Sequence, residues 1–229
     1  VFVFAWVALC RCLFDRRTVG SLGLRASASE VAFAAGGGSV VGAGLLVCTV
    51  GALWALGAYR YVGSGGSTET VVLTLAFPFA AFTEEIVCRG YILQNMRDIG
   101  QPLAGVIISS VIFTLFHSLN PGIWANALPV LSLFLTGVLL ALLYVLSGNI
   151  WFPTAVHFAW NATEGPVLGT RVSGMPVDGL LNFEANSGSG ALLTGGQFGI
   201  EGSVVLVAAQ GVLIGVLLIM LWRRTAESR

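Results

Sequence analysis

The sequence is poor in charged residues and contains no lysine. Charged residues make up 10% of the 229 residues, and the eleven basic residues are all arginine. A soluble domain carries about a quarter charged residues, so this chain has too few to cover a surface that faces water. No basic patch is present, so no nucleic-acid partner is expected. The composition therefore indicates a lipid bilayer as the surroundings.

The four cysteines show no pattern of a disulfide or metal-binding framework. Cys10, Cys12, Cys48 and Cys88 lie in or beside apolar segments and form no CxxC pair. Neither a disulfide network nor a zinc site built from thiolates is supported, and packing is the expected role of these side chains.

Long apolar runs dominate what is present. Hydrophobic residues make up 56% of the chain, and the mean hydropathy is +0.88. Each membrane span needs about 20 apolar residues, so roughly seven spans fit this length. Helices are expected, because a strand that faces lipid would leave backbone groups unpaired. The predicted fold class is an all-α, polytopic transmembrane bundle with segments at 1–14, 31–58, 70–96, 103–118, 127–147, 150–163 and 203–222.

The arginines predict an orientation in the membrane, since cytoplasmic loops carry an excess of basic residues. Successive loops alternate between the two sides of the membrane. If the C-terminal tail is cytoplasmic, most of the arginines in loops are cytoplasmic too and few lie outside. The cytoplasmic group is Arg16, Arg17, Arg25, Arg97, Arg223, Arg224 and Arg229, and the outside group is Arg60 and Arg171.

The stretch 164–202 is rich in Gly and Ser and contains scattered acids. We interpret it as one long outer loop. At that length it is either disordered or a cover over part of the protein.

Two pairs of glycines are spaced for close contact between helices. Gly38-x-x-x-Gly42 and Gly211-x-x-x-Gly215 each place two small residues on one face of a predicted helix. Helix packing is the expected role of both pairs.

Ionisable groups inside apolar segments are costly and are candidates for function. Here they are Glu84, Glu85 and Arg89 in the third segment, His117 in the fourth and His157 in the sixth. The two histidines are the only ones in the chain.

The adjacent glutamates are expected to have different roles. In a helix they project about 100° apart. Glu85 and Arg89 are spaced i,i+4 with the acid first, which is the favoured order for an ion pair. Glu84 is then free to face a cavity, where a carboxylate can act as a general base for water.

The histidines each have a partner four residues away on the same helix face. These are Phe113 before His117, and Asn161 after His157. Imidazole and amide groups can bind either an oxyanion or a metal ion. The alternative interpretation is a set of buried hydrogen-bonding residues that hold helices together.

These motifs carry a resemblance to a known family. The order Glu84-Glu85-x-x-x-Arg89, Phe113-x-x-x-His117 and His157-x-x-x-Asn161 on successive apolar segments resembles the CPBP family of CAAX prenyl endopeptidases and bacteriocin-processing or immunity (Abi) proteins. The resemblance covers roughly residues 70–165.

The resemblance implies an intramembrane endopeptidase, often described as a metalloprotease. It implies that Glu84 activates water, that His117, His157 and Asn161 bind a metal or the developing oxyanion, and that Glu85, Arg89 and Phe113 support them. A divalent metal, zinc in the first place, would then be held by Glu84, His117 and His157. Water activation without a metal stays open, with His and Asn as oxyanion donors.

We therefore expect a protease that acts on a peptide or protein at the lipid bilayer of a prokaryotic cell, crossing the membrane several times with a cytoplasmic C-terminus. Two alternatives are a catalytically inactive scaffold or immunity protein and a proton-coupled transporter. The expected division of the chain is 1–69 for N-terminal helices, 70–165 for the catalytic core, 166–202 for the outer loop and 203–229 for the last helix and tail.

Overall fold

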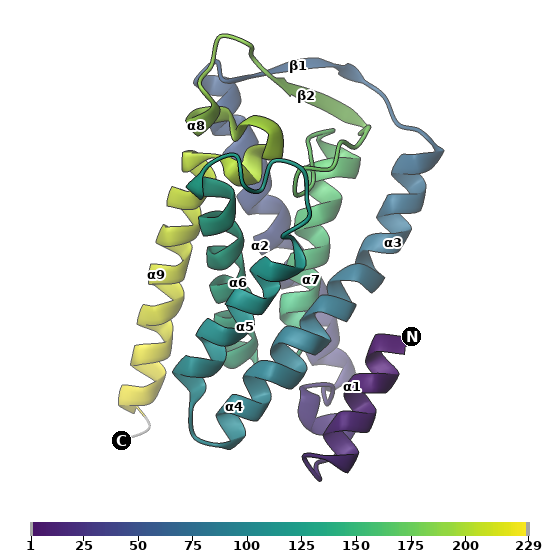
Figure 1. The fold of residues 1–229 in the computed structure, drawn as a ribbon, viewed down its shortest axis with the longest axis vertical. Helices are drawn as coiled ribbons and strands as arrows, with labels where there is room; N and C mark the ends of the chain where they lie inside the picture. The colour runs from purple at the N-terminus through teal and green to yellow at the C-terminus, as the bar shows by residue number, and fades with distance from the viewer. Residues whose placement is uncertain (1, 228–229) are drawn as a thin grey trace.

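A bundle of helices forms most of the structure, and loops cover one end of it (Figure 1). The computed structural model describes residues 2–227. The helices are α1 (Phe2–Leu13), α2 (Ala28–Ala55), α3 (Thr68–Glu85), α4 (Gln94–Asp98), α5 (Pro102–Phe116), α6 (Ala127–Ser147), α7 (Trp151–Ala162), α8 (Ala191–Thr194) and α9 (Val204–Glu227). The shorter elements are η1 (Val19–Leu22), η2 (Ile86–Leu93), η3 (Thr163–Val167), η4 (Gly196–Phe198), η5 (Ile200–Gly202), β1 (Tyr59–Ser64) and β2 (Leu181–Ala185). The chain is mostly helical, as predicted, with one small sheet that the sequence did not indicate.

Within residues 2–227, four helices are long and apolar enough to cross a membrane, namely α2, the continuous helix Thr68–Asp98, α6 and α9. The apolar helices α1 and α5 have 12 and 15 residues. At about 1.5 Å per residue both are shorter than the roughly 30 Å of a hydrocarbon core. α7, in the sixth predicted segment, has only 12 residues. The chain is an integral membrane protein, but the predicted count of about seven spans is not confirmed.

The helix with the acidic motif changes its geometry at that motif. α3, η2 and α4 form one helix, Thr68–Asp98, which begins at a capping box on Ser67. Its α-helical part ends at Glu85, and the π-helix Ile86–Leu93 follows. Such π-turns are frequent at functional sites, because they redirect the side chains that come after them. Glu84 and Glu85 therefore lie at the junction of two helix geometries.

α7, which carries the third motif, packs closely against α2. A Cβ atom at Gly38 would lie 2.8 Å from the Cβ atom of Ala155, and one at Gly42 would lie 2.3 Å from the backbone oxygen of Val156. Only residues without a side chain allow the two helices to come this close. The packing predicted for this pair of glycines is confirmed.

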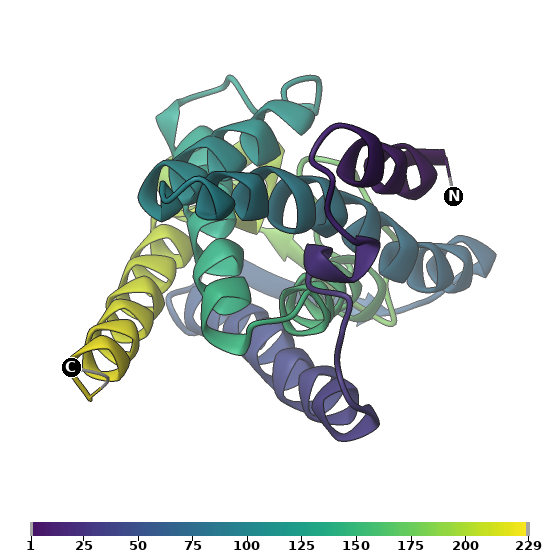
Figure 2. The same cartoon turned by 90° about the horizontal axis from the view of Figure 1, so that it is seen from below.

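The second pair of glycines does not pack against any of the described residues 2–227. A Cβ atom at Gly211 or Gly215 would meet nothing within 4 Å, so the packing prediction is wrong for them here. α9 lies at the edge of the bundle, far from α1 (Figure 2), and is fixed to α6 by a polar contact instead. Buried Gln210 donates to Thr136 Oγ1 at 2.8 Å and accepts from Ser132 Oγ at 3.2 Å. In an apolar interior, a buried amide needs such partners.

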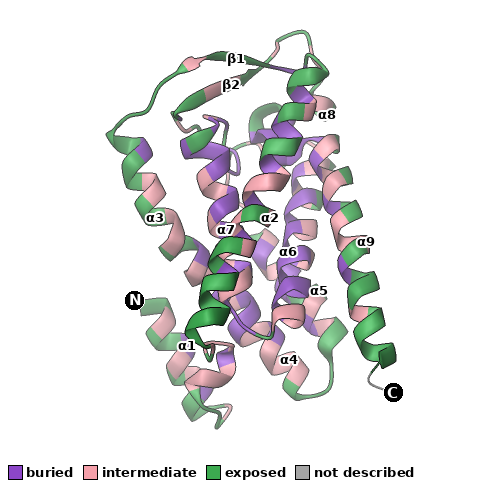
Figure 3. Ribbon diagram, turned by 180° about the vertical axis from the view of Figure 1, so that it is seen from behind, coloured by how far each residue is buried: buried purple, intermediate pink, exposed green. Residues whose placement is uncertain are grey.

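The centre of the bundle is α6. In its most apolar stretch 56% of the residues are buried, against 17–22% in the other three candidate spans. Figure 3 shows exposed residues along the outer faces of α3 and α9 and buried ones along α6. Cys88 belongs to the same buried cluster as Phe113 and Leu139. All four cysteines are free thiols.

The segment 164–202 covers the upper end of the bundle in Figure 1. Its strand β2 pairs antiparallel with β1, which follows α2. Phe198 and Ile200 are fully buried, and the side-chain amide of Asn120 donates to the backbone oxygen of Ser173 at 3.0 Å. Of the two interpretations of this loop, the structure therefore shows a cover.

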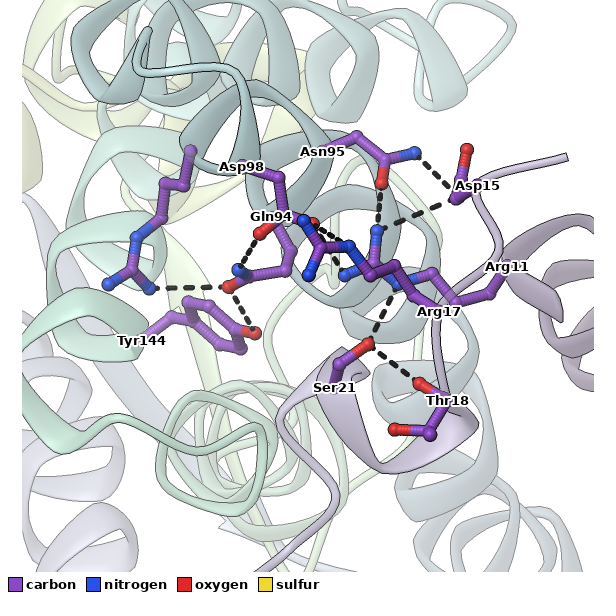
Figure 4. Close-up of polar contacts among 10 residues, drawn as sticks. Arg11, Asp15, Arg17, Thr18, Ser21, Gln94, Asn95, Asp98 and Tyr144 are labelled. Atoms are coloured by element: carbon purple, nitrogen blue, oxygen red, sulfur yellow. Dashed lines mark hydrogen bonds and ion pairs between the residues drawn. The ribbon is translucent and has the colours of Figure 1, made fainter.

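A buried polar cluster fixes α1 to the lower end of α4 (Figure 4). Arg11 is 1% exposed and donates to Asp98 Oδ2 at 2.7 Å, to Ser21 Oγ at 2.9 Å and to Asn95 Oδ1. The first apolar helix is thus attached to the helix of the acidic motif through one guanidinium group. Its five donors in a fixed plane suit a site with several acceptors.

Candidate active site

The three motifs meet at the ring of Phe113, which is 1% exposed. The guanidinium carbon of Arg89 lies 4.7 Å from the ring centroid. The ring centroids of His117 and His157 lie 4.9 Å and 5.5 Å from it. One aromatic side chain therefore contacts polar groups from η2, from the end of α5 and from α7.

Glu85 and Arg89 form the ion pair that their spacing predicts. Arg89 Nη1 donates to Glu85 Oε1 at 2.7 Å, and both side chains are 0% exposed. Arg89 Nη2 donates to the backbone oxygen of Gly137 on α6 at 2.9 Å. His157 Nδ1 lies 3.0 Å from the same Glu85 oxygen, a contact that the sequence did not indicate. Glu85 therefore joins its own helix to α7 as well as neutralising Arg89.

Both histidines are held through the same ring nitrogen. His117 Nδ1 lies 2.9 Å from the backbone oxygen of Phe113, and His157 Nδ1 lies 3.0 Å from the Glu85 carboxylate. Since both partners accept hydrogen bonds, we assign the proton to Nδ1 in each ring. Nε2 is then the atom that each histidine has available for a substrate, a proton or a metal.

His117, His157 and Asn161 line one small pocket beneath the outer loops. The pocket leaves about 10 Å³ for water, close to the minimum for a single molecule. Its lining residues are Phe113, His117, Leu133, Thr136, Leu140, His157, Trp160, Asn161, Ser173 and Glu201. The structure thus brings together three of the four predicted catalytic residues.

Glu84, the fourth predicted catalytic residue, is placed differently. It is partly buried, and its Oε2 is buried without a hydrogen-bond partner. It interacts electrostatically with His157, but Glu84 is not among the residues that line the pocket. The contacts of the two glutamates differ, since Glu85 Oε1 binds Arg89 and His157, although Oε2 of each glutamate is buried without a partner. Their separate roles stay a prediction.

Two pocket residues, Ser173 and Glu201, come from the outer loop and were missed in the sequence. Glu201 is 3% exposed. Its Oε1 accepts from Trp160 Nε1 at 3.1 Å, and its Oε2 accepts from Ser173 Oγ at 2.8 Å. No local spacing links either residue to the motifs. Only the folding of the loop over the helices brings them to the pocket.

A second missed acid, Glu164, lies close to Glu201. It is 0% exposed, and neither of its carboxylate oxygens has a hydrogen-bond partner. Burial raises the pKa of Glu164 well above its ordinary value, and the charge of Glu201 raises it further. Burial also raises the pKa of Glu201, although the hydrogen bond from Ser173 and the charge of His117 oppose this shift. The spacing of His157, Asn161 and Glu164 at i, i+4 and i+7 was a signal that could have identified Glu164.

The side chains as placed do not form a metal site. Among the described residues 2–227, no three His, Cys, Asp or Glu side chains come close enough together to hold a metal ion. Two histidines with Nε2 available are good zinc ligands, but Glu84 does not complete the set that the family resemblance implies. The metal therefore stays a prediction.

Comparison with known proteins identifies the segment that carries the motifs. Residues 66–163 match the family described as type II CAAX prenyl endopeptidase Rce1-like. The match includes the acidic motif and both histidine motifs, and it ends before Glu164, Ser173 and Glu201. No curated protein and no solved structure matches the chain.

Proposed function

From the premise that residues 66–163 place this chain in the CPBP family of intramembrane proteases, we propose that it hydrolyses a peptide bond by glutamate-activated water. The family indicates a peptide hydrolase of the CAAX type, and the apolar helices indicate a membrane protein. The substrate would be a peptide or protein segment that reaches the pocket at the bilayer. The family match does not support the scaffold and transporter alternatives.

One observation carries this proposal. Side chains from two motifs, His117 and then His157 with Asn161, line a pocket of the size of one water molecule. Hydrolysis needs a water position, a base and donors for the oxyanion. The pocket supplies the position, Asn161 and a doubly protonated His157 can supply the donors, and Glu84, which does not line the pocket but interacts with His157, would be the base.

In the proposed reaction, Glu84 accepts a proton from the attacking water as the water oxygen bonds to the carbonyl carbon. The Asn161 side-chain amide donates to the developing oxyanion, since it carries two N–H groups at any pH. Nε2 of His157 donates as well when that ring carries a second proton, and the Glu85 carboxylate is then its counter-ion. The ring of Phe113 and the contacts of Nδ1 fix both imidazoles, so little rearrangement is needed on reaching the transition state.

The test compares two glutamates of the same helix. Glu84→Gln keeps the size of the side chain and removes the base, so cleavage of a reporter peptide should fall by roughly 10²–10⁴-fold. Glu69→Gln is the matched control, because Glu69 is exposed in the first turn of α3. Full cleavage by Glu84→Gln would contradict the assignment. The purified wild-type protein should also be analysed for bound zinc, which decides whether the metal prediction holds.

For location, we propose a prokaryotic cell membrane with the C-terminal tail in the cytoplasm. The α4–α5 corner and the last turn of α9 lie at one end of the bundle, and the cover lies at the other (Figure 1). In a variant without the native cysteines, single cysteines at Arg97 and Arg223 should be labelled from the cytoplasm and one at Arg171 from outside. Labelling of all three from one side would contradict this orientation.

A further inference from the structure

The outer loop contributes one acidic side chain, Glu201, to the pocket. This residue lies outside the segment 66–163 that matches the family. Glu201 lies well after residue 163 in the sequence, but its side chain lines the pocket. It is 3% exposed, and its orientation is fixed by Trp160 on one oxygen and by Ser173 on the other. Each carboxylate oxygen has a further lone pair, so these two bonds do not use the full capacity of the group.

A buried acid beside Glu201 changes what this side chain can do. Glu164 is 0% exposed, and its two oxygens have no hydrogen-bond partner. Two carboxylates that interact in an apolar interior do not both ionise easily, and they hold one proton between them. Burial raises the pKa of both groups, and the charge of Glu201 raises the pKa of Glu164 further. The pair can therefore hold a proton next to the pocket, and burial favours the protonated form of Glu201 as well.

We propose that Glu201 is a further catalytic residue, which donates a proton to the leaving nitrogen of the peptide bond. This inference rests on the proposed hydrolysis and adds the step in which the C–N bond breaks and the leaving nitrogen is protonated. Glu84 has an unpaired oxygen but does not line the pocket, whereas Glu201 lines it together with His117, His157 and Asn161. The acid and the base would then be different carboxyl groups from different parts of the chain.

The protons balance over one turnover. Glu84 takes one proton from water while the water oxygen bonds to the carbonyl carbon. The C–N bond then breaks, its electron pair goes to nitrogen, and nitrogen takes the proton of the Glu201 carboxyl group. After the products leave, the proton on Glu84 is lost to water and Glu201 takes one up again. The sum is one water molecule consumed, with one carboxylic acid and one amine formed.

The experiment uses two substrates that differ in the leaving group. One is the reporter peptide, and the other is an ester of the same acyl part with p-nitrophenol, which leaves without being protonated. Glu201→Gln should lower peptide cleavage by roughly 10²–10⁴-fold, the effect of losing a general acid, and should leave ester cleavage nearly unchanged. Glu184→Gln is the matched control, because Glu184 is 61% exposed on β2. This variant should cleave both substrates normally.

Each other outcome has a definite meaning. Normal peptide cleavage by Glu201→Gln, with Glu84→Gln inactive, would overturn this inference and leave the proposed function standing. An equal loss of both activities would show that Glu201 only maintains the structure, which overturns the inference too. Retained ester cleavage would itself report that the variant is folded. A wild-type protein that cleaves neither substrate would overturn the proposed function as well.

Discussion

The buried pair of Glu85 and Arg89 permits a quantitative test of what holds the site together. Glu85→Gln removes the negative charge and leaves the Arg89 guanidinium buried with one backbone acceptor, the oxygen of Gly137. Breaking a buried ion pair by removing one partner costs about 3–5 kcal/mol, because the remaining charge is unpaired. In a chain of this size each kcal/mol shifts the melting temperature by about 2–4 °C. The melting temperature of Glu85→Gln in detergent should therefore fall by roughly 6–20 °C.

The double variant Glu85→Gln with Arg89→Met should recover much of this loss. It removes both charges, and the Gln oxygen can still accept from His157 Nδ1, which lies 3.0 Å from Glu85 Oε1. The contact of Arg89 with Phe113 and its bond to Gly137 are also lost, so about 1–2 kcal/mol of destabilisation should remain.

The assay is thermal unfolding of all four proteins of the double-mutant cycle, with peptide cleavage measured in parallel. A coupling energy of several kcal/mol between Glu85 and Arg89 is expected, since residues in direct contact are not additive. A Glu85→Gln protein that melts like the wild type would refute the reasoning. If it melted like the wild type and lost cleavage completely, Glu85 rather than Glu84 would be the base.

Three further predictions concern packing, the N-terminal helix and Asn161. Gly42→Ala should destabilise the protein by about 1–3 kcal/mol in thermal unfolding, because its Cβ atom would lie 2.3 Å from a backbone oxygen of α7, whereas Gly44→Ala, with nothing within 4 Å, should not. Arg11→Met should lower the melting temperature by several degrees because it removes buried hydrogen bonds, whereas the same change at Arg17, which is 58% exposed, should have little effect. Asn161 belongs to the sequon Asn-Ala-Thr but lines the pocket, so a eukaryotic host should attach no glycan there, and a mass shift removable by glycosidase would contradict this placement.

The sequence allowed the local features of the site to be predicted well. The ion pair of Glu85 and Arg89 depends on a spacing of four within one helix, and it is present. The contact between α2 and α7 depends on glycines at Gly38 and Gly42, and it is present too. Gly211 and Gly215 have the same spacing and no packing partner in the part of the chain that the structure describes. The pattern shows that a helix face can be approached closely, but not which helix approaches it.

Composition and the order of the motifs determined the membrane surroundings, the helical class and the family that residues 66–163 match, because these depend on residue types and on spacing along one helix. The tertiary structure alone decided that His157 binds Glu85, that Glu84 lies beside the pocket rather than in its lining, and that Ser173 and Glu201 complete it. Those contacts join residues tens of positions apart. They depend on how a loop folds over the ends of the helices, and no periodicity of hydrophobic or polar residues encodes that path.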